Sequence, residues 1–77
     1  MELTKPLDAL NQARDQRILV ELKNGSQFVG KLKAFDVHLN TVLDDAQEIV
    51  DGEAKRNLGR ILLRGDTIIL LSPQKGQ

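Results

Sequence analysis

The sequence predicts a small all-β domain, in which a short N-terminal helix precedes five antiparallel strands that curl into a barrel. Three observations support this class. Apolar and polar residues alternate from Arg17 onward, as they do in half-buried strands. Turn-forming pairs separate the alternating runs, namely Asn24-Gly25, Asp51-Gly52 and Gly65-Asp66. Gly30 lies inside a strand, where a missing side chain favours a sharp bend or a close backbone approach.

Size and composition exclude several other classes of protein. The 77 residues suffice for one domain, and 40% hydrophobic with 29% charged residues is typical of a soluble globular chain. Basic and acidic residues both number 11, so we expect neither a polybasic tail nor an acidic solvating segment. Because the chain has no cysteine, no secretory signal and no membrane-length apolar run, we expect a cytoplasmic protein that contacts no membrane.

The short chain also raises a question of stability. Domains below roughly 80 residues usually need disulfides, a metal or oligomerisation to supplement a marginal core. With no cysteine and a single histidine, self-association is the expected solution.

The first element is predicted to be a helix over about residues 5–14. Pro6 suits the first helical turn, where its missing N–H costs nothing. Leu3, Leu7 and Leu10 follow the i, i+4, i+7 spacing and form one apolar stripe. Two helical turns are unstable alone, so this stripe is expected to dock on the sheet.

The first two strands form the clearest predicted hairpin. The Asn24-Gly25 pair favours a turn in which both central residues have positive φ. The second strand is expected to place Lys31 and Lys33 on its solvated face. Its opposite face is expected to carry Phe28, Gly30, Leu32 and Ala34.

Three further strands complete the predicted sheet. The third covers about residues 40–49, and its alternation slips at Asp44-Asp45, which indicates a bulge. The fourth covers about 55–64 and the fifth about 67–72. The fifth strand is apolar on both faces, which predicts either a fully covered strand or, as we favour, edge-to-edge pairing between chains.

The candidate binding residues come from two segments. Asp36, His38 and Asn40 are spaced by two, so an extended segment would point them to one side. Val37 and Leu39 would point to the other side and anchor the loop. Arg64-Gly65-Asp66 follows the fourth strand. If the two segments are neighbours, a flat imidazole and a flat guanidinium can sandwich a planar base.

The remaining polar groups of this set could then read the base. The Asn40 amide offers a donor and an acceptor to a pyrimidine edge. Asp66 could fix either the Arg64 guanidinium or the Asn40 amide. A less specific interpretation also exists, in which His38 is an ordinary exposed loop residue and Gly65 simply a turn residue.

An enzyme is not expected. His38 with Asp36 or Asp66 supplies two members of an acid–base relay, but Thr41 and Thr67 are not placed as nucleophiles in any recognisable elbow or phosphate loop. The sequence lacks zinc-ligand spacing, and a two-carboxylate Mg²⁺ site has no support beyond the residues themselves. We therefore expect no catalytic residues, no metal and no cofactor.

Two segments of the chain resemble the paired motifs of the Sm family. Residues 17–40, RILVELKNGSQFVGKLKAFDVHLN, resemble the first Sm motif, and residues 61–69, ILLRGDTII, resemble the second. The opening 6–10, PLDAL, is similar to the helix of archaeal Sm-like proteins. The resemblance covers about residues 5–73 of a single domain, 1–77, with a helix at about 5–14 and motif regions at 17–49 and 55–73.

The resemblance implies an all-β (small α+β) fold, a strongly bent five-stranded antiparallel Sm-type barrel with an N-terminal helix. It implies a homo-oligomeric ring, usually a heptamer, in which the fourth strand of one subunit pairs with the fifth of the next. It also implies binding of single-stranded, uridine-rich RNA at the inner rim, in RNA processing or ribonucleoprotein assembly. Asp66 favours the archaeal type, because many eukaryotic members have asparagine there.

The resemblance further implies a role for each candidate residue. His38 and Arg64 would stack the uracil, and Asn40 would hydrogen-bond its edge. Gly65 would lend a backbone contact and Asp66 would orient Asn40. Phe35 is a candidate for a second RNA contact, while Asp36 and Leu39 would support the loop.

Two alternatives remain open. The first is a scaffold ring whose main partners are proteins that contact exposed loops such as Val50–Ala54. The second is a monomeric small-barrel module that binds peptides.

Overall fold

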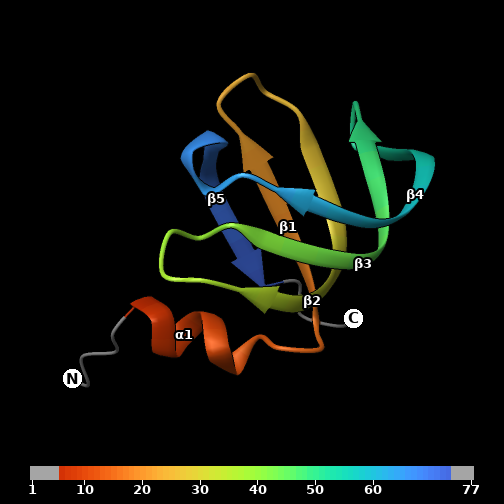
Figure 1. Cartoon of the computed structure of the whole chain (residues 1–77). Coiled ribbons are helices and arrows are strands. Elements are labelled where there is room, and N and C mark those ends of the chain that lie inside the picture. Colours follow the sequence, from red (N-terminus) through yellow and green to blue (C-terminus); the bar gives the residue numbers. More distant parts are fainter. Residues whose placement is uncertain (1–5, 74–77) are drawn as a thin grey trace.

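A computed structural model describes residues 6–73 and has the predicted order of one helix and five strands (Figure 1). The prediction for Leu3 lies outside these residues. A single 3-10 turn, η1, was not predicted as an element. The elements are α1 (Pro6–Gln12), β1 (Arg17–Leu22), β2 (Gln27–Phe35), β3 (Thr41–Val50), β4 (Glu53–Leu63), η1 (Gly65–Thr67) and β5 (Ile68–Pro73).

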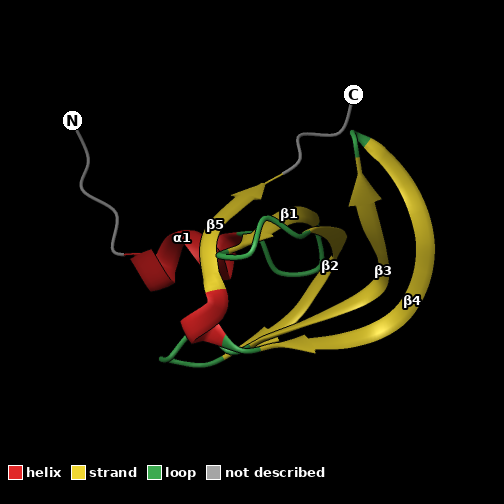
Figure 2. Ribbon diagram, turned by 90° about the horizontal axis from the view of Figure 1, so that it is seen from above, coloured by secondary structure: helices red, strands yellow, loops and turns green. Residues whose placement is uncertain are grey.

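The five strands form one antiparallel sheet with the order β4-β3-β2-β1-β5. The sheet is strongly bent, so that it wraps around its own interior (Figure 2). This confirms the predicted fold. Within residues 6–73, β4 and β5 are the two edges and do not pair with each other.

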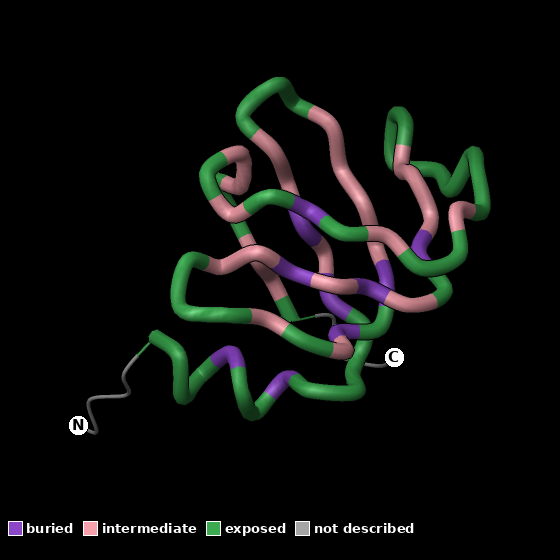
Figure 3. The backbone as a smooth tube through the Cα atoms, viewed as in Figure 1, coloured by how far each residue is buried: buried purple, intermediate pink, exposed green. Residues whose placement is uncertain are grey.

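The helix is shorter than predicted, because α1 ends at Gln12 rather than at residue 14. It lies across one end of the sheet and buries Leu10, with Ala13 buried just after it (Figures 1 and 3). Leu7 is 39% exposed, so the predicted stripe is wrong at that position. Arg14 lies beyond the helix, where its guanidinium carbon is 5.4 Å from the centre of the Phe35 ring. Neither α1 nor η1 has the length and apolar character of a bilayer-crossing helix, and no other helix occurs in residues 6–73.

The core is built mainly from strand residues of the bent sheet, together with Leu10 and Ala13, and the buried positions are coloured purple in Figure 3. The largest fully buried side chains are those of Ile18, Val20, Leu32, Thr41 and Leu43. Gly30 confirms the predicted close approach: a Cβ there would lie 3.0 Å from Leu43 Cβ and 3.2 Å from Ala46 Cα.

The β1–β2 turn differs from the predicted one. Gly25 has φ +90°, but Asn24 does not have positive φ. The N–H of Gly25 donates to the Leu22 carbonyl at 2.9 Å, and the N–H of Leu22 donates to the Ser26 carbonyl at 2.9 Å. The loop therefore has three residues, with glycine in the left-handed position of a bulged hairpin.

Strand irregularities explain one further correction and confirm one prediction. The β2–β3 register shifts between Leu32 and Ala34, and Ala34 is exposed rather than on the core face. The predicted bulge in β3 is present, because the β3–β4 register shifts between Leu43 and Ala46, and Asp45 has φ +51°. Aspartate tolerates this left-handed conformation better than most residues.

Candidate functional site

One open cleft is lined by all five predicted binding residues. They come from two connections, the loop between β2 and β3 and the η1 segment between β4 and β5, which lie side by side in Figure 2. The residues are His38, Asn40, Arg64, Gly65 and Asp66. The two segments are therefore neighbours, as the sequence argument required.

The β2–β3 loop is a compact turn rather than the extended segment predicted. The N–H of Leu39 donates to the Asp36 carbonyl at 2.9 Å, and Leu39 has φ +65°. The prediction that Val37 anchors the loop is wrong, because this side chain is 70% exposed. Leu39 does anchor it, because its side chain is half-buried against the core. Burial of this side chain offsets the cost, about 1–2 kcal/mol, of a left-handed conformation in a residue other than glycine.

Asp36 organises the loop through both carboxylate oxygens. Oδ1 accepts hydrogen bonds from the backbone N–H groups of His38 at 2.9 Å and Asn40 at 3.0 Å. Oδ2 accepts from the side-chain Nδ2 of Asn40 at 3.0 Å. The hydrogen bond from the Asn40 side chain is the largest cause that lowers the pKa of Asp36, followed among the lowering causes by the two backbone bonds.

Asn40 joins this loop to the η1 segment. Its Oδ1 accepts a hydrogen bond from the backbone N–H of Gly65 at 2.8 Å. Because Nδ2 donates to Asp36 and Oδ1 accepts from Gly65, the amide orientation is defined by both neighbours. One N–H of Nδ2 and one lone pair of Oδ1 remain available to a ligand.

Asp66 does not orient Asn40, contrary to the role implied by the family resemblance. Its Oδ2 instead accepts a hydrogen bond from the guanidinium of Arg64 at 3.0 Å, so the carboxylate fixes the arginine. The sequence left two roles open for Asp66, fixing the Arg64 guanidinium or fixing the Asn40 amide, and in the structure it contacts the guanidinium. The partner that orients Asn40 is Asp36, which was expected only to support the loop.

The two flat side-chain groups of the cleft are accessible. His38 and Arg64 are both exposed, and within residues 6–73 the imidazole makes no hydrogen bond. Planar imidazole and guanidinium groups stack on nucleobases. The cleft thus combines two stacking surfaces with one oriented amide.

Other chemistry finds less support in the described part of the chain. The hydroxyl of Thr41 donates to the Leu39 carbonyl at 2.7 Å, and that of Thr67 donates to the Arg64 carbonyl at 2.7 Å. Both hydroxyls are thus engaged with the backbone rather than with His38. No group of three or more potential metal-ligating side chains occurs in residues 6–73.

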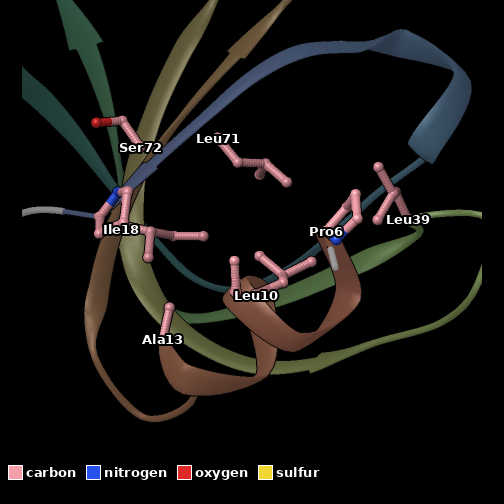
Figure 4. Close-up of a pocket in the computed structure, with 9 residues that line it drawn as sticks. Pro6, Leu10, Ala13, Ile18, Leu39, Leu71 and Ser72 are labelled. Atoms are coloured by element: carbon pink, nitrogen blue, oxygen red, sulfur yellow. The ribbon is translucent and has the colours of Figure 1, made fainter. Parts of the chain in front are cut away.

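A second hollow lies between α1 and the sheet, and Figure 4 shows Leu10, Ile18, Leu39 and Leu71 bordering it. Ser72 is the one residue of its lining with a polar side chain. The groove therefore has few side-chain groups that could hydrogen-bond to a polar ligand. Leu39 connects the groove to the cleft, because it borders the groove and lies between His38 and Asn40 in the loop.

Comparison with known proteins agrees with this geometry. The LSM domain model matches residues 8–73. An snRNP Sm-like protein of Thermococcus sibiricus is 46% identical over 69 residues, which cover 90% of this chain and 91% of the relative.

Two solved structures are similar throughout the fold. The Sm protein of Pyrococcus abyssii, solved in complex with a uridine heptamer, has a TM-score of 0.88 and 44% identity, and the match covers 92% of this chain and all (100%) of that one. An Sm-like heptamer of P. aerophilum has a TM-score of 0.89 and 31% identity, with 97% and 100% coverage. The bent five-stranded sheet, the paired motifs and these matches show that the chain belongs to the LSM-domain family of Sm-like proteins.

Proposed function

We propose that this Sm-like protein binds single-stranded, uridine-rich RNA, with one uracil in the cleft of each subunit. The observation that carries the proposal is the convergence of His38, Arg64 and the oriented amide of Asn40 in one cleft. The base stacks between the imidazole and the guanidinium, and the amide hydrogen-bonds its edge. The similar P. abyssii protein, which was solved with a uridine heptamer, supports this assignment.

The proposal includes a ring of seven subunits, built by pairing β4 of one subunit with β5 of the next. Both strands are free edges within residues 6–73, and both carry exposed apolar side chains. These are Leu62 on β4, 67% exposed, and Ile69 and Leu70 on β5. Such edges favour pairing between chains, and a repeated head-to-tail contact closes into a ring. The P. aerophilum heptamer supports the number seven.

Ring formation explains how a chain with a net charge of zero can bind RNA. Phosphate contacts usually dominate affinity for nucleic acids and make it strongly salt-dependent. Stacking contributes about 1–3 kcal/mol for each base, which is weak for one cleft. Several clefts around the central opening of one ring raise the effective concentration of binding sites along a single RNA strand. We therefore expect modest salt dependence and a preference for uridine runs.

The proposed activity is binding rather than catalysis, since neither nearby threonine hydroxyl is directed at His38. The cytoplasmic location expected from the sequence stays a prediction.

Native mass spectrometry with and without a short oligouridine tests the proposal. The expected result is a seven-subunit species that gains mass by one RNA strand. Monomers that do not bind oligouridine would contradict both the proposed ring and the proposed RNA binding. A ring that does not bind oligouridine but binds protein partners would favour the scaffold alternative.

A further inference from the structure

The two carboxylate oxygens of Asp36 have different partners. Oδ1 accepts only backbone N–H groups, those of His38 and Asn40, and thereby shapes the turn. Oδ2 accepts the Nδ2 of the Asn40 side chain at 3.0 Å. One carboxylate thus ties the loop backbone to the group that faces the ligand.

The Asn40 amide has a second restraint on its other side. The backbone N–H of Gly65 donates to Oδ1 at 2.8 Å. If the amide turned over, its NH₂ group would face this N–H, and its oxygen would face the Asp36 carboxylate. Both contacts would bring like partners together, so one orientation is strongly favoured.

A fixed amide distinguishes the two pyrimidines. Uracil presents the N3–H donor beside the O4 acceptor, whereas cytosine presents the N3 acceptor beside the N4 amino donor. For a base held in one placement by stacking and by its sugar, Oδ1 accepts from the uracil N3–H and Nδ2 donates to O4. Cytosine in that placement fits only after the amide has turned over.

We propose that Asp36 is a positioning residue that makes the cleft prefer uracil to cytosine, because it holds the Asn40 amide in one orientation. This inference rests on the proposed RNA binding. Asp36 acts through Asn40 and does not itself contact the base. Asp36 is a carboxylate at neutral pH, with both oxygens available as acceptors, and the hydrogen bond from Asn40 is the main cause that lowers its pKa further.

The isosteric substitution Asp36→Asn provides the test. With its carbonyl oxygen on the two backbone N–H groups, the new side chain presents an NH₂ group to the Asn40 Nδ2. The ratio of affinities for oligouridine and oligocytidine of equal length, measured by fluorescence anisotropy, should fall by about tenfold. A role confined to loop shape would weaken both affinities together and leave the ratio unchanged.

Asp51→Asn is the matched control. It makes the same change of charge at an exposed turn residue that has no side-chain hydrogen bond or ion pair within residues 6–73. Its affinity ratio should equal that of the unmodified protein. Asp36→Ser is a second variant, in which the hydroxyl can still accept from a backbone N–H but is too short to hold the amide.

The unmodified protein provides a test that needs no variant. In its NMR spectrum, one Nδ2 hydrogen of Asn40 should exchange slowly with water, and two fast-exchanging hydrogens would overturn the inference. An unmodified protein that binds oligouridine no better than oligocytidine would overturn the proposed function instead. If the unmodified protein discriminates and Asp36→Asn discriminates equally well, the RNA site stands and the role of Asp36 is wrong.

Discussion

Gly65 packs directly against the main chain of His38, so that a Cβ at position 65 would overlap the His38 carbonyl oxygen. The same Cβ would lie 2.8 Å from the carbonyl carbon of Leu39. Glycine is required here by space, since Gly65 is absent from the residues with positive φ. This contact brings the backbone N–H of Gly65 within 2.8 Å of the Asn40 side chain.

Gly65→Ala should therefore weaken oligouridine binding and stability together. The added methyl group meets backbone rather than a flexible side chain, so the two connections must move apart. Overpacking of this kind costs about 1–3 kcal/mol. We expect a lower melting temperature at fixed protein concentration, with at least a tenfold loss of affinity.

Gly25→Ala is the control for this substitution. Gly25 has φ +90°, but a Cβ there meets nothing within 4 Å. Alanine should thus destabilise the protein through backbone strain, by about 1 kcal/mol, and leave the affinity for oligouridine unchanged. Unchanged RNA binding by Gly65→Ala would show that the backbone contact does not shape the cleft.

Arg64→Ala should abolish most oligouridine binding while the ring stays assembled, because it removes one of the two stacking surfaces. Arg64→Lys distinguishes stacking from charge. Lysine keeps the positive charge but has no planar group to place against a base. We expect both variants to bind weakly in an anisotropy titration, with lysine recovering little of the loss.

Lys31→Ala is the control for loss of charge, since Lys31 is exposed on β2 and makes no ion pair within the described residues. Its affinity should stay close to that of the unmodified protein, because the cleft and not the overall charge binds RNA. Full recovery of binding by Arg64→Lys would indicate a phosphate contact instead of a stacked base.

The strands could be predicted from the sequence because local patterns specify them. Alternation predicted β1, whose Ile18 and Val20 are buried in the structure, and Gly30 marked a place where β2 and β3 approach each other closely. The turn after β1 was harder to predict. Asn-Gly is compatible with two hairpin geometries, and hydrogen bonds between the strands select the three-residue loop.

The site was predictable in its membership but not in its internal contacts. The spacing of His38 and Asn40 suggested an extended segment, because nothing local indicates that Leu39 adopts φ +65°. That conformation depends on burial of the leucine side chain against distant strands. The link from Asp36 to Asn40 had a possible signal, since aspartate often caps the backbone N–H two residues later.

Acid should destabilise the protein through its paired carboxylates, of which Asp44 is an instructive case. Its Oδ1 and Oδ2 accept hydrogen bonds from the Arg60 guanidinium at 2.6 and 3.0 Å. The hydrogen bond from Arg60 lowers the pKa of Asp44 from 3.8, so the folded state binds fewer protons than the unfolded state. The resulting stability is complete above the unfolded pKa and is lost as pH falls through the folded pKa.

The melting temperature should thus fall as the pH is lowered from about 5 to about 2, and Asp44→Asn should flatten that dependence. Asp51→Asn serves again as the control and should leave the slope unchanged. An Asp44→Asn profile parallel to that of the unmodified protein would show that the Arg60 pair does not contribute to acid sensitivity.

Charge on either free edge should prevent assembly without unfolding the subunit. Leu62 and Ile69 are 67% and 58% exposed, so neither contributes much to the core of one chain. Leu62→Asp on β4 or Ile69→Asp on β5 would bury a carboxylate in the proposed contact, which is costly without a partner. Sedimentation at micromolar concentration should then give single subunits with unchanged strand content by circular dichroism. Val37→Asp changes a comparably exposed side chain away from both edges and should still sediment as a ring.

Because each cleft alone binds RNA weakly, the two edge variants should also lose affinity for long oligouridine while keeping an intact His38–Arg64 cleft. Rings that persist in both edge variants would mean that the subunits associate through another surface.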